Sequence, residues 1–337
     1  MDMMTNDDQD TIAATVASFL ADRMPVVGRG RDHVTEGPEI DPLVWRECAE
    51  LGWLSLGIAE ADGGVGYGLV EEMMLFRELG RSVAPGPFLP GVLAAHLAVA
   101  AGDRELATAI ISGERRVALG TPIGVASISL TVSAELSVVH IDGADLVVVC
   151  DADGAALVPV SGCDIAAIDS IDGSVTVGRG RAAEVPAIAF APATQAAIFQ
   201  RGLVLAAAAA VGIAEAALAV AVAYAGVRVQ FGKPIGVNQA IKHWCADMAV
   251  QADGAFAQAC YAAVAVQDAL AGAATEAAVA KYFADDAARR NGEGSVQIHG
   301  AIGFTSEATP YRFVLRAQLL SQCLAGRAAL LDTVVGR

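Results

Sequence analysis

Polar side chains and glycines crowd one short stretch of the sequence, R-V-Q-F-G-K-P-I-G-V-N-Q over residues 228–239. Glycine and proline interrupt a helical pattern here, and Arg228 offers a planar fork of donors suited to a pyrophosphate. Phe231 can pack on an adenine ring or on a neighbouring subunit. Taken alone, the stretch is more simply interpreted as a turn between two helices with solvated charges.

A second glycine-rich break, Q-I-H-G-A-I-G-F over residues 297–304, follows another helical segment. Small residues let a ligand approach the backbone closely, and the amides at a following helix start attract anions. A third glycine cluster, residues 63–68, lacks the G-x-G-x-x-G spacing of a dinucleotide fold because Leu69 replaces the last glycine. It is typical of a turn between helices. The histidines show no metal-ligand spacing.

The composition excludes several classes of protein. The 337 residues are 55% hydrophobic and 18% charged, with a net charge of −16, which disfavours both disorder and a nucleic-acid partner. Few charges on so apolar a chain also indicate that another subunit buries some of its surface. The six cysteines have no C-x-x-C spacing, so we expect buried thiols in a reducing compartment.

Two segments bear on targeting. Residues 1–10 are acidic, which is unlike a signal or transit peptide. The apolar run 202–227 is long enough to span a bilayer, but Glu215 near its centre costs about 3 kcal/mol in lipid. We therefore expect a buried bundle helix, no membrane association and a cytoplasmic protein.

The predicted elements fall into three contiguous blocks. Helical periodicity covers about 8–112, short β-branched runs with tight turns cover about 115–191, and longer helices fill the rest, with breaks at 231–234 and 300–303. This order predicts a mainly α, α+β fold and disfavours a doubly wound parallel sheet. We predict a helical domain over 1–112, a β-domain over 113–192 and a helical bundle over 193–337.

Both glycine-rich breaks together resemble the C-terminal domain of acyl-CoA dehydrogenases, which carries R-x-Q-F-G-x-P-I-x-x-x-Q followed about 60 residues later by Q-x-x-G-(G/A)-x-G-F. The N-terminal motifs L-G-W at 51–53, E-A-D-G-G-V-G at 60–66 and E-L-G-R at 78–81 are similar to that family's helical domain. The resemblance covers nearly the whole chain in the right order. It implies an N-terminal helical domain, a middle β-barrel or sandwich domain, a C-terminal four-helix bundle and a tetramer.

The resemblance also implies FAD at a subunit interface, with the isoalloxazine ring and acyl-CoA in one subunit and the adenosine and pyrophosphate clamped by its neighbour. The matching clamp positions are Arg228, Gln230, Phe231, Ile235, Gln239, Gln297 and Gly300. The family's reaction is α,β-desaturation of a thioester: a carboxylate removes the α-proton and a hydride leaves for the flavin. The electrons then pass to an electron-transfer flavoprotein or a similar acceptor.

The chain departs from the family at the catalytic base. The common motif R-D-A-K-I-x-x-I-Y-E-G-T, laid on the sequence from Arg316, puts Ala325 at the glutamate and Arg327 at the threonine. Alanine cannot accept a proton, so no catalytic residue is predicted. Relatives that carry the base on the first bundle helix would place it at residues 200–201, which are Gln and Arg. Glu215 and Asp332 are possible substitutes, although both are more simply polar residues at a subunit contact.

The middle domain departs as well. Residues 118–124, A-L-G-T-P-I-G, stand near the family's Y-x-x-T-E-x-x-x-G-S-D loop, and nothing resembles its W-I-T-N strand. The half-site for the flavin ring and thioester is therefore degraded, whereas the half-site for adenosine is intact.

This asymmetry suggests a subunit of an α2β2 heterotetramer whose partner, a second acyl-CoA dehydrogenase subunit, carries the base. Short base-less chains of this kind resemble subunits of actinobacterial acyl-CoA dehydrogenases that act on sterol side-chain CoA thioesters in steroid degradation. Two alternatives stay open: a self-sufficient homotetrameric dehydrogenase or oxidase with a relocated acid, and a non-catalytic scaffold subunit.

Overall fold

The computed structural model describes residues 5–26 and 39–336. Its first block is helical, and capping explains where the first two helices begin. Asn6 and Gln9 form a capping box at the first, and the Asp41 side chain accepts from Leu43 N at the second, with Pro42 in the first turn. The helices of this block are α1 (Asp7–Arg23), α2 (Pro42–Glu50), α3 (Leu69–Arg81), α4 (Phe88–Ala100) and α5 (Arg104–Ile111).

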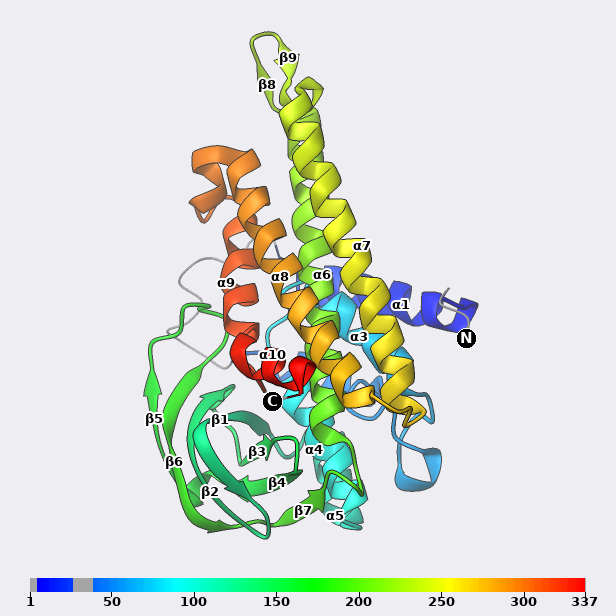
Figure 1. Ribbon diagram of the computed structural model, residues 1–337, viewed down its shortest axis with the longest axis vertical. Coiled ribbons are helices and arrows are strands. Elements are labelled where there is room, and N and C mark those ends of the chain that lie inside the picture. Colours follow the sequence, from blue (N-terminus) through cyan, green and yellow to red (C-terminus); the bar gives the residue numbers. More distant parts are fainter. Residues whose placement is uncertain (1–4, 27–38, 337) are drawn as a thin grey trace.

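The second block is one seven-stranded sheet that curls on itself at the lower left of Figure 1. The strand order is β5-β6-β2-β1-β3-β4-β7, and only the β1–β3 pair is parallel. Alternate residues of β2 point into the sheet's own core, as the period of two requires. The strands are β1 (Val117–Ile128), β2 (Thr131–Val139), β3 (Leu146–Cys150), β4 (Gly154–Pro159), β5 (Cys163–Ile168), β6 (Val177–Pro186) and β7 (Ala189–Pro192).

The third block is a helical bundle that extends upward from the sheet in Figure 1. The α6 helix lies at its centre, and a small hairpin of β8 and β9 joins α6 to α7 at the tip. The elements are α6 (Ile198–Val227), β8 (Val229–Gln230), β9 (Lys233–Pro234), α7 (Gln239–Gln267), α8 (Ala273–His299), α9 (Pro310–Leu320) and α10 (Arg327–Val335). The predicted order of helical domain, β-domain and bundle is confirmed, and the residue boundaries between them stay predictions.

Glycines hold α3 against α6. A Cβ atom at Gly80 would lie 2.0 Å from Ala209 O, and one at Gly212 would lie 1.9 Å from Arg77 O. Larger residues at either position would therefore separate the two helices. The apolar run noted in the sequence forms α6, which is long and apolar enough to cross a membrane by length and composition alone, and 67% of its most apolar window is buried within the protein.

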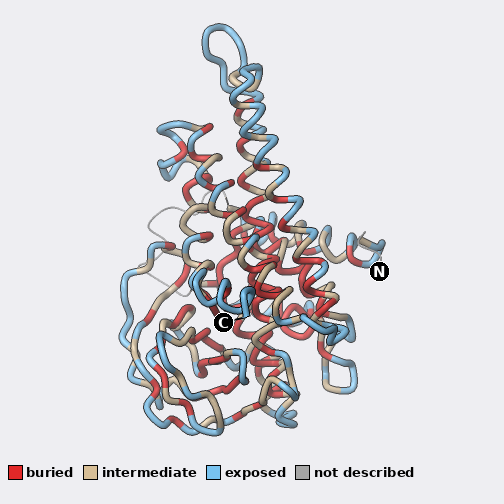
Figure 2. The backbone as a smooth tube through the Cα atoms, viewed as in Figure 1, coloured by how far each residue is buried: buried red, intermediate tan, exposed pale blue. Residues whose placement is uncertain are grey.

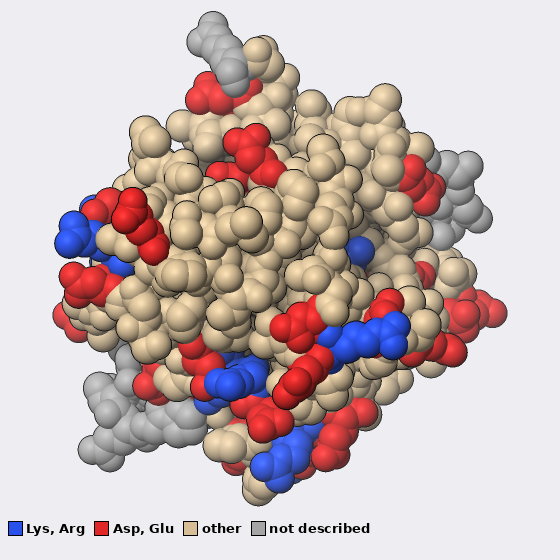
Figure 3. Space-filling view, turned by 90° about the horizontal axis from the view of Figure 1, so that it is seen from below, with Lys and Arg blue, Asp and Glu red and all other residues tan. Residues whose placement is uncertain are grey.

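Residue burial changes along the length of the bundle, from a buried body to an exposed tip. In Figure 2 the buried residues concentrate where the bundle packs against the first block and the sheet, whereas the hairpin tip and the adjoining turns of α6 and α7 are exposed. Several apolar side chains lie bare there, among them Val222, Val227, Phe231 and Val250. The opposite end of the molecule presents a broad surface whose charged side chains gather mostly in the lower half of the view in Figure 3. Exposed apolar surface at the tip is the kind that another protein chain covers.

Candidate functional site

The hairpin at the bundle tip is built from the first polar stretch of the sequence. Val229 pairs with Pro234 and Gln230 with Lys233, and the turn between them has positive φ at Phe231 (50°) and Gly232 (77°). A tight two-residue hairpin needs this backbone, and Gly232 adopts it without a steric penalty. The Phe231 side chain, 103% exposed, projects from the turn with nothing packed on it.

The tip carries positive charge in an otherwise acidic chain. Between Glu215 and Asp247 the sequence contains three Lys or Arg residues, Arg228, Lys233 and Lys242, and no Asp or Glu. All three side chains are exposed, and none forms a salt bridge within the described residues. An isolated basic cluster of this kind attracts a phosphate-bearing ligand. The same charge pattern can be read from the sequence, where Lys233 and Lys242 join the Arg228 of the clamp motif.

The second glycine-rich break lies where α8 ends. Gly300 has φ 66° and ψ −144°, a conformation that side chains with a Cβ atom rarely adopt. No atom lies within 4 Å of the position that its Cβ would occupy. Gln297 is exposed on the last turn of α8, two residues before His299. This corner therefore offers open space beside an amide side chain.

Packing brings the two breaks to the same end of the bundle. The rings of Tyr224 and His299 stack at 4.2 Å with an interplanar angle of 21°, which ties the end of α6 to the end of α8. Beneath them Ala225, Ile298 and Ile235 share a small apolar cluster. Arg228 follows Tyr224 by one helical turn, and its backbone N–H donates to Tyr224 O.

The predicted clamp residues thus all lie at the bundle tip or at the end of α8, but their surroundings differ. Gln239 is exposed at the first position of α7, and Gln230 is exposed with its amide donating to the neighbouring Val229 carbonyl. Ile235 is half-buried in the apolar cluster, where it supports the hairpin. Their roles toward a cofactor stay predictions.

The other candidate region is the loop between α9 and α10, in which the resemblance placed the missing base. Ala325 is 8% exposed there. The preceding Leu324 adopts φ 67°, and its N–H donates to the Thr121 hydroxyl of β1 over 2.9 Å. A Cβ atom at Gly202 on α6 would lie only 3.0 Å from the Leu324 side chain. The loop is therefore bonded to the sheet and packed against the bundle.

A small cavity of about 70 Å³ lies behind this loop, between α3, α4, α6, α9 and the sheet. Its lining is mostly apolar, and no carboxylate is among the residues that line it in the described chain. Cys323 belongs to the wall, and burial raises the pKa of its thiol to about 11, so it stays protonated near neutral pH. His140 also lines the cavity, but its ring Nδ1 already contacts the Glu39 carboxylate.

A second cavity of about 200 Å³ lies beside Thr121 and Leu319. It contains one carboxylate, that of Asp169, which is exposed at the start of the loop between β5 and β6. No sequence motif marks Asp169, because only the fold brings this loop next to α9. Gln322 and Cys323, which precede Ala325, line the same cavity.

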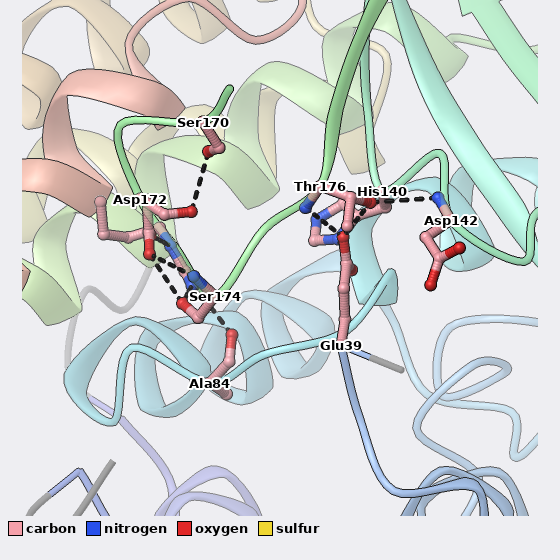
Figure 4. A network of polar contacts seen from close by, with 9 residues as sticks. Glu39, Ala84, His140, Asp142, Ser170, Asp172, Ser174 and Thr176 are labelled. Atoms are coloured by element: carbon pink, nitrogen blue, oxygen red, sulfur yellow. Dashed lines mark hydrogen bonds and ion pairs between the residues drawn. The ribbon is translucent and has the colours of Figure 1, made fainter. Parts of the chain in front are cut away.

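Arg316 holds the same loop in place. Its guanidinium contacts Asp172 Oδ2 at 2.5 Å, Ser174 Oγ at 2.8 Å and Ala84 O at 2.9 Å. Figure 4 shows the Asp172 and Ser174 side chains close together, with Ala84 next to them. Burial alone would raise the pKa of Asp172, but the charge of Arg316 and the Ser174 hydrogen bonds outweigh it and lower the pKa. One arginine thus joins the first block, the sheet and α9.

A parallel junction lies on the other side of the loop (Figure 4). Glu39 contacts the His140 ring nitrogen at 2.5 Å and also accepts from Thr176. Burial would raise the pKa of Glu39, but His140 and the Thr176 hydrogen bonds lower it. The loop from β5 to β6 is therefore held at its middle by Arg316 and at its end by Glu39. It lies beside Thr121, where the family resemblance implies the degraded ring half-site.

Residues 200–201, the other position considered for a base, have different surroundings. Arg201 pairs with the fully buried Glu72, which also contacts His96 at 2.7 Å. Burial by itself would raise the pKa of Glu72, but His96 and Arg201 hold it at about 2. Burial lowers the pKa of His96, so Arg201 is the permanent cationic partner. The Gln200 side-chain oxygen is buried without a hydrogen-bond partner among the described residues.

The two substitute acids do not lie at the base position. Glu215 contacts Arg77 at 2.7 Å and Arg81 at 2.9 Å, so it links α6 to α3. Asp332 is exposed on α10. Neither side chain lines the cavity behind Ala325.

Two family models match the chain: "Acyl-CoA dehydrogenase, N-terminal domain" over residues 6–112 and "Acyl-CoA dehydrogenase, C-terminal domain" over residues 192–333. The acyl-CoA dehydrogenase IpdE2 of Mycobacterium tuberculosis is 31% identical over 327 residues, which cover 96% of this chain and 94% of IpdE2. Acyl-CoA dehydrogenase FadE34 of the same organism is 38% identical over 129 residues, 38% of this chain but only 18% of FadE34.

Solved structures agree with these matches. The structure described as "Tcur3481-Tcur3483 steroid ACAD G363A variant" has a TM-score of 0.85 and 26% identity, covering 98% of this chain and 97% of that chain. The ChsE4-ChsE5 complex from Mycobacterium tuberculosis also has a TM-score of 0.85, with 23% identity and coverage of 100% and 98%, which shows a shared fold.

Proposed function

The chain belongs to the acyl-CoA dehydrogenase family, and from this premise we propose that it is one subunit of a FAD-dependent complex. In this proposal it completes the FAD site of a partner subunit and has no catalytic base of its own. Family membership places the reaction among oxidoreductions of a CH–CH bond. The partner dependence, the base and the substrate belong to the proposal.

The bundle tip fits the adenosine and pyrophosphate half of FAD. Arg228 is exposed without a salt bridge among the described residues, and the open space at Gly300 can admit a ligand close to the backbone. Arg228 would pair with the pyrophosphate and the Gln297 amide would donate to the adenosine half, while Phe231 covers the ligand. When bound, FAD supplies the acceptor for the hydride that leaves the thioester's β-carbon.

One observation carries the proposal: the loop at the base position presents Ala325 and is bonded to the sheet through Leu324 and Thr121. A methyl group cannot take the α-proton, and the cavity behind it, about 70 Å³, is lined by no described carboxylate. This chain's residues therefore bind and orient one half of a cofactor, and the proton transfer falls to the partner's carboxylate.

The proposed class of acyl-CoA substrate rests on the descriptions of similar proteins. One of the similar solved structures is described as a steroid ACAD with two component names. We propose a bulky acyl-CoA, such as a steroid side-chain CoA thioester, bound in the partner's groove. The electrons would pass to an electron-transfer flavoprotein or a similar acceptor in the cytoplasm.

A self-sufficient enzyme is the second candidate, and Asp169 is the observation that favours it, because its carboxylate lines the cavity beside Thr121. Such an enzyme would retain flavin and turnover when purified alone and would lose turnover on Asp169→Asn. Our proposal expects the opposite: the co-expressed complex keeps its turnover when Asp169 is replaced in this chain.

The direct test of the clamp is FAD content in the complex. The double change Arg228→Ala with Gln297→Ala removes two contacts, each of which is expected to weaken FAD binding about tenfold. Arg104→Ala, an exposed arginine of α5, is the matched control. Loss of most FAD only in the double variant supports the clamp, whereas unchanged FAD content would favour a scaffold subunit that takes no part in the site.

A further inference from the structure

A large groove at the opposite end of the first block is not used by the proposed function. It has a volume of about 780 Å³ and lies between α2 and α5, with the residues just before β1 as its floor. Pro42, Trp45 and Ala49 form one wall, and Thr108 and Ile111 form the other. The walls are mainly apolar.

The floor of this groove holds an arginine without an acceptor. Arg116 Nε is buried and has no hydrogen-bond partner, and it is the one cationic atom of this kind in the described chain. No salt bridge of the described residues includes its guanidinium. The nearby Asp145 is already engaged, since it accepts from Arg116 N at 2.9 Å and from Arg115 at 3.4 Å. Arg116 as a whole is half-buried and lines the groove, so a carboxylate in the groove can bind its guanidinium without competing with a protein acceptor.

The Arg116 side chain lies over the ring of Trp45, which restricts its position. Its guanidinium carbon lies 5.7 Å from the centroid of the Trp45 ring. Trp45 is itself fixed, because its indole N–H donates to Gly113 O at 3.0 Å and its ring packs on Phe88 at 5.3 Å. Gly113 is required there, since a Cβ atom would lie 2.7 Å from the indole nitrogen.

The charges around the groove limit the ligand to a small net charge. Arg46, Glu50 and Glu114 are exposed at its sides and give one positive and two negative charges. A strongly anionic ligand would meet the two glutamates, whereas a single carboxylate can reach Arg116 while an apolar body covers the walls. We propose that this groove binds an amphiphilic monocarboxylate, with the carboxylate on Arg116 and the apolar portion against Trp45, Ala49 and Ile111.

The test uses octanoate as the probe and the full chain labelled with 5-fluorotryptophan. The chain has three tryptophans, so fluorine NMR gives three resonances, and Trp45→Phe identifies the one beside Arg116. Octanoate is expected to shift the Trp45 resonance saturably, while hexanol, which lacks the charge, binds at least about tenfold more weakly. The resonances of Trp53 and Trp244 report whether the fold is intact.

Two variants separate the site from general adsorption. Arg116→Gln is expected to weaken octanoate binding about tenfold or more, and Arg46→Gln, an exposed arginine of the same groove, is expected to leave it within about twofold. Arg116→Lys keeps the charge but lacks the planar fork of donors. It replaces the glutamine variant in the binding measurement if that variant does not fold. The proposal is overturned if octanoate gives no saturable Trp45 shift, or if neither Arg116 variant weakens binding.

Discussion

Leu324 and Thr121, 203 positions apart in the sequence, are joined by a hydrogen bond of 2.9 Å from the Leu324 N–H to the threonine hydroxyl. This bond fastens the α9–α10 loop to the first strand of the sheet. It lies next to Ala325, where the family resemblance expects a catalytic glutamate. The hydroxyl of the A-L-G-T-P-I-G segment thus binds protein backbone in this chain.

Replacing Thr121 with valine keeps the side-chain shape but removes the acceptor. Leu324 N is then left without its partner, which is expected to lower the free energy of unfolding by about 1–3 kcal/mol. Thr121→Ser keeps the hydroxyl and is expected to lose less than the valine variant. Denaturant unfolding of both variants checks this, and equal stability of valine and wild type would show that the bond does not hold the loop.

Arg316 makes a separate prediction about the loop from β5 to β6. Arg316→Gln removes the charge that pairs with Asp172 and loosens the contacts to Ser174 and Ala84. Amide hydrogen exchange at residues 170–176 is expected to become faster while exchange in α8 stays unchanged. Arg312→Gln, on the same helix, is the control. Slow exchange of the loop in the Arg316 variant would contradict its proposed anchoring.

Glu72 predicts an acid-dependent loss of stability. Its folded-state pKa of about 2 lies below the ordinary value of 4.5, so its carboxylate stabilises the fold above pH 4.5. That contribution, about 3 kcal/mol, is lost as the pH falls from about 5 to about 2. Glu72→Gln is expected to flatten this part of the stability profile.

At neutral pH the same variant leaves the half-buried Arg201 charge without its partner, which is expected to cost about 3 kcal/mol. Unfolding curves between pH 3 and pH 7 measure both effects. Glu105→Gln, an exposed carboxylate of α5, should reproduce the wild-type profile. A wild-type slope that persists in Glu72→Gln would assign the acid sensitivity to other carboxylates.

The large features of the fold were predictable because they depend on local signals. The three-block order follows from changes of hydrophobic period, and the hairpin and the end of α8 follow from glycines at residues 232 and 300. The paired contacts of Arg316 with Asp172 and of Leu324 with Thr121 were not predictable. They join residues 144 and 203 positions apart, and no local pattern marks such partners.

In the candidate site, too, some residues were predictable from the sequence and others were not. The clamp residues form two compact motifs, so resemblance alone assigned them, and the fold adds that Tyr224 and His299 hold the motifs together. Asp169 and Arg116 carry no motif, and only the cavities that the fold creates draw attention to them. Ile235 was expected at the cofactor, but its half-buried position shows that it also supports the hairpin.

A substitution of Phe231 tests whether the bundle tip lies in the interface with a partner subunit. Its side chain is fully exposed in the chain alone, so Phe231→Ala is expected to change stability by less than about 0.5 kcal/mol. If a partner covers it, the same change should weaken association about tenfold or more. Sedimentation velocity with the partner subunit measures this, and Val125→Ala, an exposed residue of β1, is the control. Unchanged association would place the interface elsewhere.

Flavin stoichiometry tests the central proposal most directly. The chain is purified alone and together with a co-expressed partner subunit, and bound FAD is counted per chain by absorbance after protein denaturation. We expect little FAD on the isolated chain, no desaturation of a thioester, and two FAD per α2β2 tetramer in the complex. One FAD on each copy of the isolated chain, with turnover of an acyl-CoA, would contradict the account.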